Sequence, residues 1–193
     1  RDYQSLNPKP FAETSGGRNE NGIYFGFAVN TAPNWRINAY YDLWNHEWPR
    51  FGGDGPSAGH EWLAKLTYTF RKKMELYLQV KNEIKEENTD EVSQKVDFLS
   101  QRQNFYARVH LSLRVNPSLE WRSRIDVGFT EFEGSKQKGI STYQDLIYRR
   151  MNSPLSFSTR FAIFDTDSYA IRFYAYENDL LYSFSIPAYY GRG

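Results

Sequence analysis

Two residues near the middle of the chain have types and a spacing that could support hydrolysis. His110 and Ser112 are two positions apart, so in an extended strand both side chains point to the same face. A serine nucleophile needs a base within hydrogen-bond reach and a third group that orients this base. The surrounding pattern places the pair among arginines on a polar face, so we predict no catalytic residues. A lipid hydrolase that uses His110 and Ser112 stays open as an alternative.

Several possible metal ligands flank a long loop that is predicted between residues 45 and 59. They are His46, Glu47, Asp54, His60 and Glu61. Imidazole and carboxylate groups from such a loop could converge on a metal ion. The loop is rich in glycine and proline, and tryptophans stand at its roots, as in the aromatic girdle at a membrane interface. We therefore predict an ordinary loop, with no metal and no cofactor.

A short acidic motif stands near the end of the chain. Asp165 and Asp167 resemble the start of a calcium-binding loop, but the later ligands and the glycine of such a loop are missing. A tight turn that is capped by aspartate side chains is the preferred interpretation.

Arginines recur on the polar side of the alternating segments. They could form a ladder of cross-strand ion pairs, for which Asp42, Glu75 and Asp126 are the available carboxylates. They could instead form an electropositive strip that attracts anions such as a nucleic acid backbone or sugar acids. Tyrosines on the same strands could then stack on bases or sugars. These tyrosines are Tyr40, Tyr77, Tyr106 and Tyr174.

Composition limits which class of protein can position these residues. The 193 residues carry a net charge of +1 and include no cysteine, which excludes disulfides and thiolate metal sites and argues against a generally basic nucleic-acid-binding protein. The mean hydropathy of −0.71 and the absence of a long uncharged run argue against membrane-spanning helices. An aromatic content of 18% in so hydrophilic a chain is typical of transmembrane β-barrels, although a soluble all-β domain can also produce it.

Most of the chain from Gly22 onward alternates with a period of two, which predicts β-strands. Between Trp35 and Trp44, for example, Trp35 and Ile37 share one face whereas Arg36 and Asn38 share the other. The alternating segments cover residues 23–30, 35–44, 62–70, 75–83, 105–114, 121–129, 140–148, 155–163, 169–175 and 181–186. These are about ten strands of roughly ten residues, each able to cross about 23 Å at a tilt of ~45°.

The charged polar face favours a membrane barrel over a soluble sandwich, because it suits a wet lumen while the aromatic residues meet lipid. We therefore predict an antiparallel up-and-down transmembrane β-barrel with at least ten strands visible. The charged residues predicted to face the lumen are Arg36, Asp42, Lys65, Glu75, Lys81, Arg108, His110, Arg114, Arg122, Arg124, Asp126, Arg160 and Arg172. The residues predicted to face lipid are Trp35, Ile37, Trp62, Leu66, Leu76, Leu78, Phe105, Val109, Leu111, Trp121, Ile125, Phe129, Phe157, Phe161, Ile171 and Phe173.

The lengths of the connections support the same class. Short connections are predicted at 31–34, 71–73, 116–118 and 150–154, and longer ones at 45–59, 85–101 and 132–138. Outer-membrane barrels have short periplasmic turns and long extracellular loops. On this basis residues 1–21 are an extracellular loop or unstructured lead-in, and residues 22–193 are a barrel segment. Because both ends would then lie outside the cell, we expect a piece of a larger barrel that is incomplete at both ends.

The C-terminal stretch carries a resemblance to a known family. The segments PLSFSTRFAIFDTD (Pro154–Asp167) and YAYENDLLYSFSIPAYYGRG (Tyr174–Gly193) resemble the barrel part of a Bacteroidota outer-membrane family. Proteins of that family often carry helix-hairpin-helix modules, similar to competence DNA receptors, ahead of the barrel. No such module is present in this sequence, so DNA binding is not carried over from the family, which also supplies no catalytic residues to transfer. The resemblance implies an outer-membrane location and a Bacteroidota-like source.

The sequence therefore predicts a non-enzymatic protein of the bacterial outer membrane. It would act as a pore or transport scaffold, or as a structural subunit of an envelope complex. Its predicted partners are membrane lipid and other outer-membrane or periplasmic subunits, and nucleic acid is not supported by this segment. Besides the hydrolase, a soluble β-barrel binding module with an aromatic interior remains as an alternative.

Overall fold

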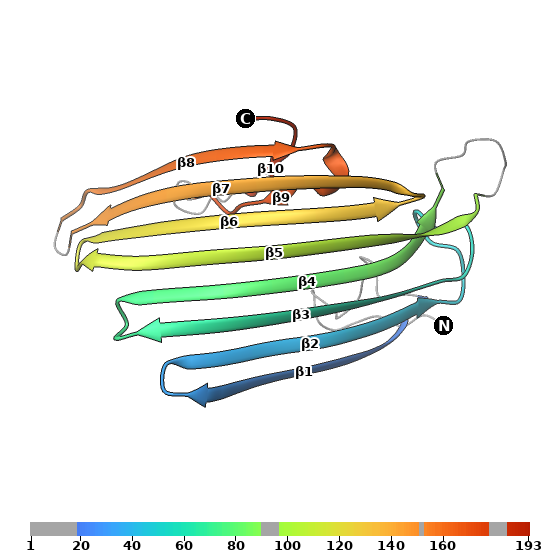
Figure 1. Cartoon of the computed structure of the whole chain (residues 1–193), viewed down its shortest axis with the longest axis horizontal. Coiled ribbons are helices and arrows are strands. Elements are labelled where there is room, and N and C mark those ends of the chain that lie inside the picture. Colours follow the sequence, from blue (N-terminus) through green and yellow to red (C-terminus); the bar gives the residue numbers. More distant parts are fainter. Residues whose placement is uncertain (1–18, 90–96, 151–152, 178–184) are drawn as a thin grey trace.

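Eight long antiparallel strands form one sheet. The computed structural model describes residues 19–89, 97–150, 153–177 and 185–193. The strands are β1 (Asn21–Ala32), β2 (Trp35–His46), β3 (Ser57–Phe70), β4 (Met74–Asn88), β5 (Leu99–Asn116), β6 (Leu119–Phe132), β7 (Ser135–Arg149) and β8 (Ser156–Thr166). They lie side by side in the order of the sequence (Figure 1), which confirms the all-β, antiparallel, up-and-down prediction. No helix in the described part of the chain is long and apolar enough to span a bilayer.

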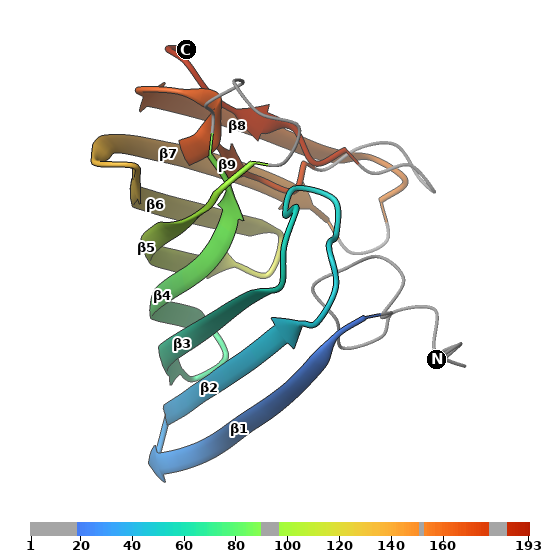
Figure 2. The ribbon, with the colours of Figure 1, turned by 90° about the vertical axis from the view of Figure 1, so that its right-hand side faces the viewer.

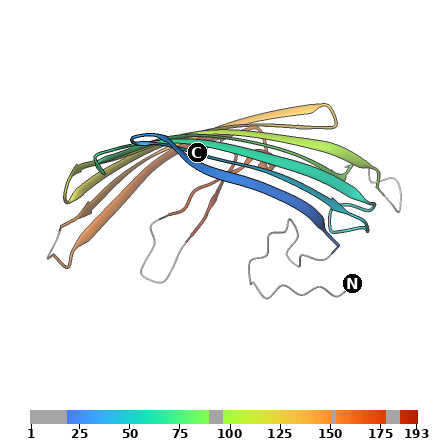
Figure 3. The ribbon, with the colours of Figure 1, turned by 90° about the horizontal axis from the view of Figure 1, so that it is seen from below.

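The sheet is strongly curved but its two edges do not meet (Figures 2 and 3). β1 pairs only with β2, and β8 pairs with β7 along its length. One end of β8 has a second neighbour, because Phe164 and Gly193 exchange two backbone hydrogen bonds and the N–H of Thr166 donates to the carbonyl of Gly191. Closure into a barrel is therefore not seen among the described residues. The predicted lead-in over residues 1–21 lies outside them except for its last three residues.

The connections at one end of the sheet are short, as predicted. The β1–β2 and β3–β4 connections use positive φ angles at Asn34 (73°) and at Arg71 and Lys72 (46° and 55°). At the other end, the β2–β3 and β4–β5 connections are long, although β4 continues to Asn88 and shortens the second. The prediction of a long connection at 132–138 is wrong. Glu133 and Gly134 form a two-residue turn with φ angles of 51° and 75°, as the twist of a hairpin favours.

The end of the chain departs from the predicted strand at 169–175. Residues Tyr169–Ile171 form a 3₁₀ turn, η1, and Phe173–Tyr174 form a two-residue strand, β9, that pairs with β10 (Ala188–Tyr189). The side chain of Ser168 caps η1 by accepting a hydrogen bond from the N–H of Ala170, at 3.2 Å. The strands β9 and β10 lie on the concave side of the sheet (Figure 3). The predicted strand at 181–186 lies almost wholly outside the described residues.

Two residues predicted to face lipid are therefore placed elsewhere. Ile171 and Phe173 are 0% and 4% exposed and lie against the concave face, not on the outside of a strand. Glycines make room for them, since a Cβ on Gly128 would lie 3.0 Å from Ile171 Cδ1 and one on Gly139 would lie 3.1 Å from Phe173 Cε2. The buried apolar residues that alternate at 169–175 are therefore those that pack against the concave face of the sheet. This position of Ile171 and Phe173 corrects the sequence-based assignment.

The buried apolar core lies between the concave face and this C-terminal segment. Phe173, Ala175 and Tyr189 pack around Tyr143 of β7. The ring of Tyr189 also stacks on Phe164 of β8, with centroids 5.0 Å apart and planes 2° apart. The core is small, and most large apolar side chains of the eight strands are on the opposite, exposed face.

A glycine under a tryptophan ring provides a first stability test. Trp44 is 5% exposed and its ring covers Gly59 of the paired strand, so that an added Cβ would lie 2.6 Å from the ring. Gly59→Ala is expected to lower the free energy of unfolding by about 1–3 kcal/mol, because overpacking forces the ring to move. Gly53→Ala is the control, since its nearest contact would be an ordinary 3.6 Å. Equal denaturant midpoints for the two variants would contradict the close packing of Trp44 on Gly59.

Candidate functional site: the charged inner face

The concave face of the sheet, here called the inner face, carries the polar half of every alternating strand. In an antiparallel sheet, directly paired residues share a face and alternate residues along a strand change face. One cross-strand row, for example, runs Asn38, Lys65, Gln79, Arg108, Asp126, Ser141 and Phe164. Twelve of the predicted charged residues lie on this face: Arg36, Asp42, Lys65, Glu75, Lys81, Arg108, His110, Arg114, Arg122, Arg124, Asp126 and Arg160.

Asp126 is the centre of the first group of charges. It is 5% exposed, accepts a hydrogen bond from Arg108 Nε at 2.5 Å, and lies 2.8 Å from Arg124 Nε, which forms an ion pair with it but no hydrogen bond. Arg108 comes from β5, whereas Arg124 and Asp126 both come from β6. One carboxylate thus balances two guanidinium groups, and the group keeps an excess of positive charge.

A second group joins β7, β8 and the C-terminal segment. Asp145, which is 2% exposed, receives Nε and Nη2 of Arg160 at 2.6 and 2.7 Å in a two-pronged contact. Arg160 also donates from Nη1 to the carbonyl of Tyr176, at 2.8 Å, and its guanidinium lies 4.1 Å from the ring centroid of Tyr143. Two parallel N–H···O bonds between one guanidinium and one carboxylate are the strongest form of an arginine–carboxylate pair.

Other charges on the face form pairs whose acidic members were not predicted as ion-pair partners, although Glu61 was considered as a possible metal ligand. Lys81 lies 2.6 Å from Glu61, and Arg122 lies 2.6 Å from Glu120. Two of the three carboxylates expected as partners, Asp42 and Glu75, form no ion pair within the part of the chain that the structure describes. The signal for Glu61 and Glu120 was their position in the alternation, but choosing among carboxylates also requires the register between strands.

His110 and Ser112 do lie on one face of β5 but do not form a pair. The hydroxyl of Ser112 donates to Glu120 Oε1, at 2.9 Å. The ring of His110 instead stacks on Tyr77, with centroids 4.9 Å apart. A nucleophile and its base would need a hydrogen bond between them, so this geometry does not favour the hydrolase alternative.

The possible metal ligands around the β2–β3 connection are also kept apart. His46 lies near Glu20, at 3.4 Å, and Glu61 is paired with Lys81. The carboxylate of Asp54 accepts the N–H of Asp97 at 3.0 Å, and this hydrogen bond lowers the pKa of the Asp54 carboxyl. Within the described ranges no three histidine, cysteine, aspartate or glutamate side chains come together as metal ligands, Glu47 and His60 included.

The acidic motif near the end of β8 behaves as a turn. Asp167 Oδ2 accepts the backbone N–H of Lys138, at 2.8 Å, and Asp165 pairs with Arg192 at the surface, at 3.0 Å. The two carboxylates are therefore used by different partners.

Arg172, the thirteenth predicted lumen residue, lies on the C-terminal segment that faces the inner surface of the sheet. Its Nε donates to the hydroxyl of Tyr174, and its Nη1 donates to the carbonyl of Tyr169, at 3.1 Å. The bond to Tyr174 raises the pKa of the Arg172 guanidinium further above its usual value. The residue therefore keeps its charge at any physiological pH.

The outer face holds the other fourteen residues predicted to face lipid. They are Trp35, Ile37, Trp62, Leu66, Leu76, Leu78, Phe105, Val109, Leu111, Trp121, Ile125, Phe129, Phe157 and Phe161. Many of these side chains are well exposed, for example Leu78 at 47% and Phe129 at 52%. The two faces thus differ sharply in polarity.

No family model, characterised protein or solved structure matches this chain. The resemblance to a Bacteroidota outer-membrane family therefore stays a prediction from the sequence. The functional argument rests on the geometry of the two faces.

Proposed function

We propose that this chain forms part of the wall of an outer-membrane β-barrel and acts, without catalysis, as a pore or transport scaffold or as a structural subunit of an envelope complex. The observation that carries the proposal is the apolar outer face. One row across all eight strands consists of Val29, Ile37, Leu66, Leu78, Val109, Ile125, Thr142 and Ile163. None of these residues is charged.

Neighbouring rows extend this band along the strands. Phe27 begins a row that continues through small and branched residues to Ile140 and ends at Asp165 of β8, and Phe70 begins one that reaches Trp121 and Leu146. Soluble monomers rarely expose a continuous apolar surface of this extent. Lipid acyl chains would cover this apolar surface, so that it would not be exposed to water. The polar inner face would meet water, as in membrane barrels.

The soluble alternative requires the aromatic and aliphatic side chains to pack against one another as a dry interior. In the structure Trp35 is 40% exposed and Ile163 is 51% exposed, and the only buried apolar cluster among the described residues lies on the opposite face. Those positions support the membrane arrangement over the soluble one.

The open edges of the sheet add a requirement. Unpaired N–H and C=O groups are very costly in lipid, so membrane-spanning sheets have to be closed. The free edges of β1 and β8 would therefore be covered by further strands, from this chain or from another subunit. The hydrogen bonds from Phe164 and Thr166 to the residues near Gly193 already cover a short stretch of the β8 edge.

Single-tryptophan variants test which face meets lipid. Each variant keeps one of the five tryptophans and carries phenylalanine at the others. In liposomes whose acyl chains carry bromine, the fluorescence of Trp62 on the outer face is expected to be quenched. Trp44, on the inner face and 5% exposed, is the internal control and is expected to stay bright.

The outcomes separate the candidate functions. If neither tryptophan is quenched and the chain stays in the supernatant without detergent, the soluble binding module replaces the membrane proposal. Equal quenching of both would also contradict it, because the two faces would then not be distinguished by lipid. A planar-bilayer recording that shows no conductance at any voltage would remove the pore and leave the structural role.

A further inference from the structure

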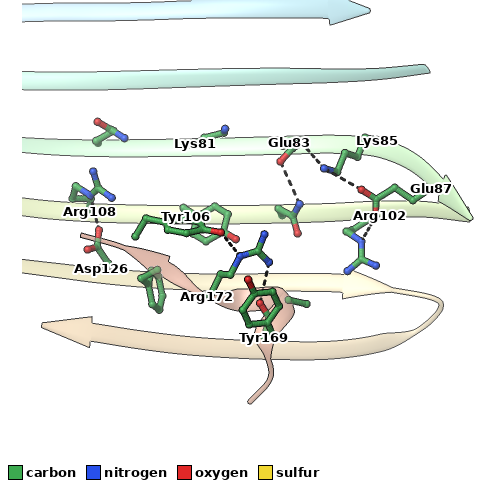
Figure 4. A pocket seen from close by; sticks show the side chains of 15 residues that line it. Lys81, Glu83, Lys85, Glu87, Arg102, Tyr106, Arg108, Asp126, Tyr169 and Arg172 are labelled. Carbon is green, nitrogen blue, oxygen red and sulfur yellow. Dashed lines mark hydrogen bonds and ion pairs between the residues drawn. The ribbon is translucent and has the colours of Figure 1, made fainter. Parts of the chain in front are cut away.

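A cavity of about 650 Å³ lies between the inner face of β4–β6 and the segment that contains η1 and β9 (Figure 4). The sheet contributes residues such as Lys81 and Arg108, and the segment contributes Tyr169, Arg172 and Tyr174. The volume falls in the range of small-molecule sites, roughly 300–1,000 Å³. Because the two walls come from distant parts of the sequence, the cavity exists only while the segment is docked.

Most charged groups in the cavity already have partners of opposite charge. Arg108 is bound to Asp126 at 2.5 Å, and Glu87 receives Arg102 at 2.7 Å and Lys85 at 3.0 Å. Figure 4 shows these pairs along the sheet wall. Within the cavity these pairs neutralise one another, since Arg124, the source of the excess positive charge around Asp126, does not line it. The paired groups are therefore not the first place where a charged ligand would bind.

Arg172 differs from these residues. Its described partners are the hydroxyl of Tyr174 and the carbonyl of Tyr169, and no carboxylate oxygen of a described residue lies within 4.0 Å of it. The two tyrosine rings lie beside the guanidinium, with centroids 4.3 and 5.4 Å from its central carbon. The guanidinium is thus held in place by neutral groups and retains donors for an anion.

Two further polar groups of the cavity have no side-chain partner, and two of its rings are partly exposed although Arg172 lies beside both and Tyr190 contacts the ring of Tyr169. No side-chain hydrogen bond joins the amide of Gln79 or the hydroxyl of Tyr106 to another described residue. The rings of Tyr169 and Tyr174 are 53% and 48% exposed. The cavity therefore offers a fixed cation, uncharged donors and acceptors, and two ring faces.

We propose that this cavity binds a short acidic saccharide, with one hexuronate carboxylate on Arg172. The apolar C–H face of the sugar ring would pack on Tyr169 or Tyr174, and its hydroxyls would reach Gln79 and Tyr106. This inference goes beyond the proposed function, because it depends on the inner face alone and holds whatever medium covers the outer face.

The lining favours a sugar acid over a nucleic acid strand. Of the lining residues, Lys81, Lys85, Arg102, Arg108 and Arg172 are basic and Glu83, Glu87 and Asp126 are acidic. The carboxylates of the lining can accept hydrogen bonds from sugar hydroxyls, of which a saccharide carries several per ring and a nucleic acid backbone few. A ligand with one carboxylate per ring and many hydroxyls matches this mixture.

Binding of trigalacturonate to the detergent-solubilised full chain tests the proposal by calorimetry. Saturable binding is expected. The same trisaccharide with all its carboxylates methyl-esterified is expected to bind about 10- to 100-fold more weakly, since it lacks the carboxylate charge with which Arg172 would pair. This comparison uses the unaltered protein. Arg172→Gln should weaken trigalacturonate binding by a similar factor, and Tyr169→Leu by about 2- to 10-fold.

Arg192→Gln is the matched control, because Arg192 is 85% exposed and pairs with Asp165 away from the cavity. It is expected to bind trigalacturonate like the unaltered chain. The proposal is overturned if trigalacturonate does not saturate, if its ester binds equally well, or if Arg172→Gln has no more effect than Arg192→Gln. Tighter binding of a short oligothymidylate would show a nucleic acid site instead. None of these results depends on the lipid quenching of the tryptophans.

Discussion

Asp145→Ala is expected to lower the free energy of unfolding by about 3–5 kcal/mol, the largest effect of any single substitution considered. Asp145 is 2% exposed and holds the guanidinium of Arg160, whose side chain is 17% exposed, through bonds of 2.6 and 2.7 Å. Without the carboxylate, a guanidinium would stay largely buried with no countercharge. Since Arg160 also holds the carbonyl of Tyr176, the attachment of the C-terminal segment would weaken as well.

Asp165→Ala provides the matched control for this prediction. It also removes an aspartate from an arginine, at 3.0 Å, but Asp165 and Arg192 are 53% and 85% exposed. An exposed pair of this kind contributes less than about 1 kcal/mol. Denaturant titrations of the two variants in micelles measure the difference. Similar losses would show that the Asp145–Arg160 pair is not the desolvated contact that its burial indicates.

A double variant separates the unpaired charge from the lost contact. When both members of a buried pair become apolar, much of the loss is recovered, because no charge remains to be solvated. Asp145→Leu combined with Arg160→Leu is therefore expected to be more stable than Asp145→Ala. If the double variant is equally unstable, the hydrogen bonds themselves, including the bond to Tyr176, supply the stability.

The sequence predicted the face of a residue better than its partner. Arg108 and Asp126 were both placed on the polar face from the period of two alone, because a strand alternates strictly. Asp145 is not among the residues predicted for this face, although it lies two positions from Tyr143 and therefore on the same face of β7. In the register of the sheet Asp145 is opposite Arg122 on one side and Arg160 on the other, and it pairs with Arg160. The register between strands and the length of the side chains decide which arginine a carboxylate pairs with. The period-two pattern of one strand carries no information about either.

The two-residue turn at Glu133–Gly134 shows a related limit. The charged and polar residues at 132–138 predict a loop, yet in the structure they continue the ladder between β6 and β7 up to Phe132 and Ser135. Gly134, whose φ is 75° in the structure, is the residue in the sequence that signals a tight hairpin. Polarity near the end of a strand marks exposure to water and does not show where pairing stops.

Ile171→Ala is expected to release the C-terminal segment while leaving the sheet intact. Ile171 is fully buried on the inner face, where it fills the space above Gly128 and beside Tyr106. Truncation of a buried isoleucine costs about 2–5 kcal/mol. Ile171 is one of the few buried apolar residues by which the segment contacts the sheet, so the cost falls on the docking of the segment. Sheet pairing runs over whole strands and does not need Ile171.

Hydrogen exchange followed by mass spectrometry separates docking from global stability. A peptide that covers η1 and β9 is expected to exchange at least about 30-fold faster in Ile171→Ala, since each 1.4 kcal/mol is a factor of ten. A peptide from β7 is expected to keep its rate. Ile186→Ala is the control, because Ile186 is 52% exposed in the same terminal stretch. Equal acceleration in β7 would show that segment and sheet unfold together.

The same docking can be tested from the sheet side. Gly128→Ala places a Cβ 3.0 Å from Ile171 Cδ1 and equally close to the ring of Tyr106. It should therefore speed exchange in η1 and β9 in the same direction as Ile171→Ala, although it adds an atom instead of removing several. If both variants speed exchange in η1 and β9, the packing of Ile171 on Gly128 is the contact that holds residues 169–175 against the inner face. Acceleration by Ile171→Ala alone would place that contact elsewhere in the segment.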